Sequence, residues 1–160
     1  MTPDQAEQVQ RACAIIGAHL RGDAEGLSIL TDDLVQNPSD DVPRWADASF
    51  LAVVVVGTAL AMWWSTTFEE ALRRLTPISV PLIPGAGINW EIAIQIALSV
   101  SATSQAPPEL TMQIDVPTAI QSAFSIAIGG GTQLAELTGV SVEDWFATLA
   151  TQAAAEAEGA

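Results

Sequence analysis

The residues of this sequence that could carry acid–base or metal chemistry are carboxylates in adjacent pairs. Such pairs occur four times, as Asp32-Asp33, Asp40-Asp41, Glu69-Glu70 and Glu143-Asp144. Two carboxylates could in principle act as a hydrolase, but the spacing of a calcium-binding loop, Asp-x-Asp-x-Asp-Gly, does not occur. Glu69 and Glu143 fall in the first turn of predicted helices, where the helix dipole stabilises anions. We therefore interpret the pairs as helix-start residues, and a carboxylate-based enzyme is the last alternative.

The chain has one thiol and one imidazole, Cys13 and His19. A lone cysteine cannot form an intramolecular disulfide bond, and a lone histidine cannot build a zinc site dominated by histidines. Six positions on a helix separate the two side chains by a steep angle, which disfavours a Cys-His dyad. The apolar neighbours Ile15 and Ile16 predict that Cys13 is buried. The sequence therefore predicts no catalytic residue, no cofactor and no metal, and we expect no enzyme.

The charge of the chain is strongly negative, with 19 acidic residues against 5 arginines, no lysine and a net charge of −14. Direct binding to nucleic acid needs clustered cations, so we expect none. Solubility explains the acidity most simply, and the alternative is an acidic inhibitor that mimics a nucleic acid and acts on a DNA- or RNA-binding protein. Charged residues make up only 15% of the chain, well below the usual quarter or so. We therefore expect apolar surface that a protein partner or a second copy covers, as in a homo-oligomer.

The adjacent tryptophans Trp63 and Trp64 are the candidate interface residues. Neighbouring positions on a helix point about 100° apart, so both side chains rarely face one core. Because tryptophan is enriched at the centres of interfaces, we predict that one of the two lies at a subunit interface.

Capping residues and helical spacing predict the N-terminal elements. Thr2-Pro3-Asp4-Gln5 has the form of a capping box and begins a first helix that ends at Gly22. Asp23 can cap a second helix, and the composition of residues 36–41 predicts a loop. The N-terminus has neither the basic nor the apolar region of a secretory signal, so we expect a cytoplasmic protein.

A third helix is predicted to begin near Pro43, to break near Ser65 and to end, after a restart, around Leu75. Its apolar run, Phe50–Trp64, is about fifteen residues long, and a membrane-spanning helix needs about twenty. We therefore expect a buried core helix and no membrane association.

A connector rich in proline and glycine, residues 76–87, precedes a region that allows two interpretations. Within residues 88–116, apolar residues alternate with smaller or more polar ones at the period of a β-strand, which would give a central hairpin. Asn89 is a good helix cap, however, and a helix that is apolar all round and buried at the centre would have the same composition.

The C-terminal part is predicted to form two helices. Asp115 caps a helix that starts near Pro117, and Gly129-Gly130-Gly131 predicts a break or kink in it. The triple glycine is not followed by the Gly-Lys-Ser/Thr of a phosphate-binding loop. The last helix is predicted to open at Ser141 and to fray over residues 153–160.

An internal repeat is predicted from the recurrence of Asp41-Val42-Pro43 as Asp115-Val116-Pro117, at an offset of 74 residues. The same offset pairs further residues without a gap, among them Phe50 with Phe124, Gly57 with Gly131, Glu69 with Glu143 and Leu72 with Phe146. We interpret residues 1–75 and 76–160 as two related helical halves packed as one domain. The fold class is then mainly α and compact, with residues 90–104 helical like residues 3–20; the alternative is α+β with a central hairpin over 88–116.

Two segments resemble small uncharacterised helical proteins of high-GC actinobacteria and their phages. Residues 18–27, AHLRGDAEGL, are similar to the "GD-x-E…L" opening of such proteins, and residues 137–144, LTGVSVED, are similar to their "TG-x-S-x-E" helix link. The resemblance implies an actinobacterial or phage origin and a helical fold, and it implies no activity.

From these observations we expect a non-enzymatic helical module for protein–protein interaction or self-assembly. The low charge density, the Trp63-Trp64 pair and the missing catalytic set motivate this expectation.

Overall fold

The computed structural model describes residues 2–36, 44–76, 78–79 and 82–159, with backbone only for residues 33–36 and 44–47. These residues form eight helices and no strand, so the predicted mainly α fold is confirmed. The helices are α1 (Pro3–Leu20), α2 (Ala24–Gln36), α3 (Arg44–Trp64), α4 (Phe68–Arg74), α5 (Trp90–Thr103), α6 (Pro108–Thr111), α7 (Val116–Thr138) and α8 (Val142–Gly159).

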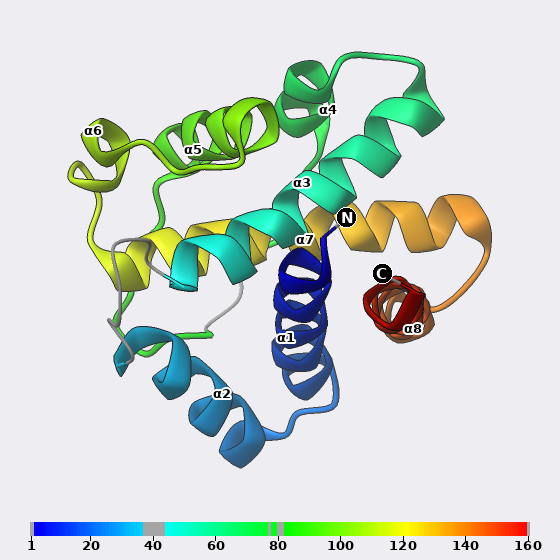
Figure 1. Ribbon diagram of the computed structural model, residues 1–160, viewed down its shortest axis with the longest axis horizontal. Coiled ribbons are helices and arrows are strands. Elements are labelled where there is room, and N and C mark those ends of the chain that lie inside the picture. The colour runs from blue at the N-terminus through cyan, green and yellow to red at the C-terminus, as the bar shows by residue number, and fades with distance from the viewer. Residues whose placement is uncertain (1, 37–43, 77, 80–81, 160) are drawn as a thin grey trace.

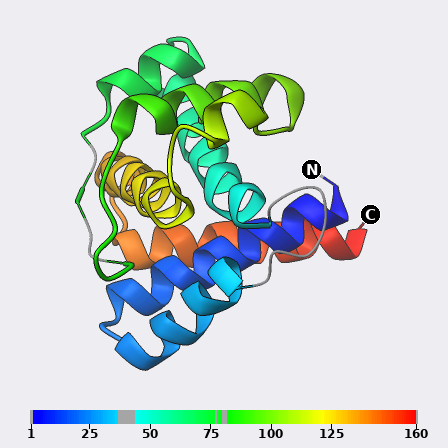
Figure 2. The same cartoon turned by 90° about the vertical axis from the view of Figure 1, so that its left-hand side faces the viewer.

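Helices α3 and α7 cross in the middle of the molecule, with α4, α5 and α6 on one side and α1, α2 and α8 on the other (Figure 1). Residues 118–131 of α7 are all buried, and the large side chains at their centre include Phe124, which is fully buried together with Phe50 of α3. Helices α1 and α8 lie side by side and run in opposite directions (Figure 2). The apolar excess of the sequence is therefore concentrated in one core to which both halves contribute.

The alternative of a central hairpin over residues 88–116 is wrong, because this region contains α5 and α6. The side-chain oxygen of Asn89 accepts a hydrogen bond of 3.2 Å from the backbone N–H of Ile92 and caps α5. Helix α5 packs against α3, α4, α6 and α7. A helix with neighbours on several sides is apolar around most of its circumference, which accounts for isoleucines at alternate positions, such as the buried Ile94 and Ile96.

The predicted break at Gly129-Gly130-Gly131 is also wrong, because α7 continues through all three glycines to Thr138. Close packing explains Gly130 and Gly131. A methyl group at Gly130 would overlap Val56 of α3, and one at Gly131 would overlap the Phe146 ring of α8. Glycine inside a helix costs about 1 kcal/mol relative to alanine, and here the close approach of two neighbouring helices offsets that cost.

Polar side chains of α7 bind the backbone of the connector that leads to α5. The backbone N–H of Ile83 donates to Gln121 Oε1 at 3.0 Å, and that of Gly87 donates to Thr118 Oγ1 at 3.3 Å. The N–H of Asn89 donates to Ser122 Oγ at 2.9 Å. Most buried polar groups in proteins are hydrogen-bonded, and these bonds satisfy Thr118, Gln121 and Ser122 and hold the described part of the connector along α7. Ser125 Oγ is buried without a hydrogen-bond partner among the described residues.

Most local predictions about helix ends are confirmed. Thr2 and Gln5 form both hydrogen bonds of the capping box, and Asp23 Oδ1 accepts from the N–H of Gly26 at 2.9 Å at the start of α2. The predicted loop over 36–41 and the start near Pro43 lie outside the described residues, apart from Gln36, which ends α2. Fraying from residue 153 is wrong: α8 is helical to Gly159 because it packs along α1.

The predicted offset of 74 residues relates the ends of four helices. Trp64 ends α3 and Thr138 ends α7, and α4 and α8 begin at the corresponding residues 68 and 142. In both turns a hydroxyl oxygen caps the following helix: Thr67 Oγ1 accepts from the N–H of Glu70, and Ser141 Oγ accepts from the N–H of Asp144. The offset does not extend to α1 and α5, which begin 87 residues apart, at residues 3 and 90. Duplication of the whole half therefore stays a prediction.

Within the described residues, no single helix is long and apolar enough to cross a membrane. One bent pair passes the same test of length and composition, residues 48–64 with α4, and its two helices meet at 96°.

Replacement Gly131→Ala tests the close packing of α7. Helix propensity alone favours alanine by about 0.5–1 kcal/mol, but the added methyl group overlaps the Phe146 ring. We expect the free energy of unfolding to fall by about 1–3 kcal/mol, as for other overpacked cores. Urea denaturation measures the change, with Gly159→Ala as the control because no atom lies within 4 Å of that position. An unchanged or raised stability of Gly131→Ala would contradict the packing.

Replacement Gln121→Met tests the hydrogen bonds between α7 and the connector. Methionine keeps the length of the side chain but leaves the N–H of Ile83 without its acceptor in a part-buried place. We expect a loss of about 1–3 kcal/mol in the free energy of unfolding. Gln133→Met is the matched control, because Gln133 accepts from the N–H of Thr76 at an exposed place where water can substitute. Equal losses in the two variants would show that burial of this bond is unimportant.

Candidate functional site

The side chains of the two candidate interface residues, Trp63 and Trp64, have different surroundings at the end of α3. The Trp64 ring is partly buried and lies 5.0 Å from the guanidinium carbon of Arg74, a cation–π contact. Trp63 is 54% exposed, and the preceding Met62 is 77% exposed. Of the pair, Trp63 is thus the side chain that is available to a partner, and its role at an interface stays a prediction.

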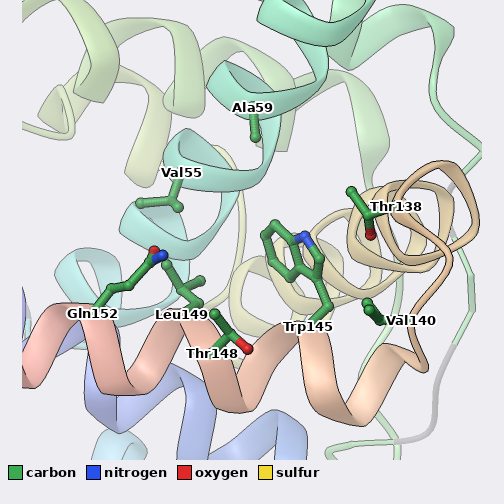
Figure 3. A pocket seen from close by; sticks show the side chains of 8 residues that line it. All are labelled: Val55, Ala59, Thr138, Val140, Trp145, Thr148, Leu149 and Gln152. Atoms are coloured by element: carbon green, nitrogen blue, oxygen red, sulfur yellow. The ribbon is translucent and has the colours of Figure 1, made fainter.

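A groove of about 370 Å³ lies between α3 and α8, next to the turn that joins α7 to α8 (Figure 3). Figure 3 shows Trp145, Leu149 and Gln152 on α8 on one side of it and Val55 and Ala59 on α3 on the other. No residue that lines the groove is charged. The lining residues are Val55, Ala59, Thr138, Val140, Trp145, Thr148, Leu149 and Gln152.

The walls of the groove follow from helical spacing and from one turn. On α8, Trp145, Leu149 and Gln152 are spaced i, i+4, i+7 and therefore share one side of the helix. The turn depends on Gly139, whose φ of 74° is in the left-handed region that favours glycine. Phe146 holds α8 in place, because its buried ring fills the space beside Gly131.

Trp145 forms the end of the groove nearest the turn. Its indole ring is partly buried and meets the Phe146 ring edge-to-face, with centroids 5.0 Å apart and planes at 87°. Such aromatic pairs are favourable beyond the area that they bury. The position of the Trp145 ring is therefore stabilised by its contact with the buried ring of Phe146.

Exposed apolar residues extend the groove along α3. Met62 and Trp63 follow Ala59 by three and four residues, so they lie on the same side of the helix as Ala59. Val140, 46% exposed, adds apolar surface at the turn. We call the residues that line the groove, together with Met62 and Trp63, the α3–α8 face. It is an apolar, uncharged surface with a hollow at its centre.

Glu69 and Glu143, the carboxylates considered for catalysis, are exposed and lie in different surroundings. Glu69 is in the first turn of α4, near Arg73. Glu143 is in the first turn of α8 and lines a hollow with Cys13 and Arg21. Within the described residues, no group of three or more His, Cys, Asp or Glu side chains could bind a metal ion. The structure thus places Glu69 and Glu143 on different helices, α4 and α8, and does not bring them together in one of the described hollows.

Other carboxylates stabilise helix starts. The hydroxyl and the backbone N–H of Thr118 donate to Asp115, which lowers the pKa of that carboxyl group. The guanidinium of Arg73 donates to Glu91 at 3.0 Å and lowers the pKa of Glu91 in the same way. Asp115 and Glu91 thus fit the interpretation of acidic residues as helix-start residues, but the pair Asp32-Asp33 lies inside α2 and does not.

Comparisons of the chain with protein-family models, with curated proteins and with solved structures give no match. The predicted origin in actinobacteria or their phages therefore stays a prediction.

The sequence identified Trp63 but not the groove beside it. The signal was present on each helix separately, as Val55, Ala59 and Met62 on α3 and Trp145, Leu149 and Gln152 on α8, both with the spacing i, i+4, i+7. The sequence of either helix alone does not predict that these two sides face each other, because their arrangement depends on how α3 and α7 cross.

The thiol of Cys13 offers a test of the α1–α8 packing. Its predicted burial is confirmed, and burial raises its pKa from 9.0 to about 12. The folded state thus holds the proton more tightly, so this contribution to stability is complete below pH 9 and is lost as the pH rises toward 12. We expect the native thiol to react with a maleimide far more slowly at pH 8 than the thiol of the urea-unfolded chain. Equal rates would contradict the burial.

Proposed function

We propose that this protein is a non-enzymatic module for protein–protein interaction, and that a partner's apolar side chains bind at the α3–α8 face. The observation that carries the proposal is the uncharged groove of about 370 Å³ joined to the exposed Met62 and Trp63. Large apolar side chains at an exposed position gain about 1.5–3 kcal/mol each when they become fully buried. A surface that combines such side chains with a hollow supports recognition by insertion of a partner's side chain.

The polar groups of the groove distinguish this proposal from a small-molecule site. Pockets for small molecules place a few convergent polar or charged groups that fix the orientation of the ligand. Here the polar groups are the side chains of Thr138, Thr148 and Gln152 and the indole N–H of Trp145. Thr138 Oγ1 already donates to the backbone oxygen of Leu134 at 2.8 Å. The groove thus offers shape and apolar surface more than directed hydrogen bonds, which suits an apolar side chain.

Met62→Ser tests the proposed interaction surface. The probe is an uncharged amphipathic peptide with leucines at helical spacing, titrated into the isotope-labelled chain and followed by NMR. We expect amide shifts around Val55, Ala59 and Leu149, and an affinity at least tenfold lower for Met62→Ser, about 1.4 kcal/mol. Met112→Ser is the matched control, because Met112 is also exposed, at 85%, but lies at the end of α6.

Shifts centred elsewhere, or equal losses in the two methionine variants, would contradict the proposed surface. Sedimentation velocity of the unliganded chain over a range of concentrations tests whether the predicted homo-oligomer forms. An oligomer that Met62→Ser dissociates and Met112→Ser leaves intact would make a second copy the partner.

A further inference from the structure

We propose that the occupant of the α3–α8 face is a positively charged segment of a different protein, anchored by an apolar side chain in the groove. This inference rests on the proposed function and names the partner's chemistry. It depends on three observations: the charge of the chain, the location of its arginines and the carboxylate beside the groove.

The net charge of −14 disfavours binding of two classes of partner, because like charges repel. A second copy would bring an equal negative charge to the same surface, and a nucleic acid would bring its phosphates. Charges of opposite sign, by contrast, steer a partner to its site and raise the rate of association. A cationic protein segment is the class of partner that this charge attracts.

None of the arginines whose side chains are described lines the groove, and two of them are engaged within the chain. Arg73 is paired with Glu91 at 3.0 Å, and Arg74 lies over the Trp64 ring. Arg21 lines the separate hollow between α1 and α8, together with Glu143. The lining of the groove itself contains no arginine, so a cationic partner meets no like charge there.

A carboxylate lies beside the groove. On α8, Asp144 is exposed and shares with Thr148 and Gln152 a shallow hollow that adjoins the groove. An apolar anchor with arginines or lysines next to it matches this neighbouring apolar and acidic surface.

The charges and the apolar anchor of such a site respond differently to salt. Exposed charges are screened beyond about 10 Å at 0.1 M salt, whereas burial of the anchor is insensitive to moderate salt. We therefore expect the charges to govern the rate of association and its salt dependence, and the anchor to govern where the segment binds.

Fluorescence anisotropy with the full chain and a set of labelled peptides tests the inference. The first peptide has a Leu-Phe-Leu centre with two arginines at each end. In the second, glutamines replace the arginines, and in the third, serines replace the apolar centre. We expect the first peptide to bind at least tenfold more tightly than the other two at low salt, and its affinity to approach that of the glutamine peptide as salt increases.

Two variants of the protein test whether the carboxylate beside the groove attracts the arginine peptide. We expect Asp144→Asn to weaken binding of the arginine peptide about threefold at low salt and to leave the glutamine peptide unaffected. Asp4→Asn is the matched control, because it removes one exposed carboxylate from the first turn of α1 instead of α8. Equal effects of the two variants would show a response to total charge and would overturn the assignment to this face.

The remaining outcomes separate this inference from the proposed function. Equal binding of the arginine and glutamine peptides at low salt would overturn the cationic partner and leave an apolar interaction surface. Equal binding of the serine peptide would overturn the anchor. An oligomer dissociated by Met62→Ser would overturn the inference in favour of a second copy, and failure of every peptide to bind would overturn the inference together with the proposed function.

Discussion

The packing of α7 against α3 is the contact on which the rest of the architecture depends. Gly130 leaves the space that Val56 and Leu60 of α3 occupy, so the two helices approach more closely than larger residues would allow. Each helix then ends in a turn with a residue of positive φ, Ser65 after α3 and Gly139 after α7. The crossing of the two long helices therefore also sets where α4 and α8 begin.

The α3–α8 face is a consequence of this geometry. Because α8 leaves the turn at Gly139 and is held by Phe146 beside Gly131, its apolar side lies opposite Ala59. The contact between Trp64 and Arg74 keeps one tryptophan against α4, which leaves Trp63 exposed beside the groove. The packing of α7 against α3 thus also places α8, and with it the candidate interaction surface between α3 and α8.

Local features of the fold could be predicted from the sequence, and features that depend on distant neighbours could not. The cap formed by Asp115 is specified within four residues, so the start of α7 was predictable. The break at Gly129-Gly130-Gly131 was predicted wrongly because the side chains that pack against Gly130 and Gly131 come from other parts of the chain. The alternation over 88–116 fits a strand or a buried helix equally, and packing on several sides decides for the helix. Helical geometry predicted that the two tryptophans diverge, but the groove needs two walls about 90 residues apart in sequence.

Hydroxyl-radical footprinting with mass spectrometry tests most directly the claim that the α3–α8 face is an interaction surface. Met62, Trp63 and Met112 are exposed to 77%, 54% and 85% and should all oxidise readily in the free chain. With the arginine peptide bound, we expect Met62 and Trp63 to become protected while oxidation of Met112 is unchanged. Unchanged oxidation of Met62 and Trp63 under saturating peptide, or equal protection of Met112, would contradict it.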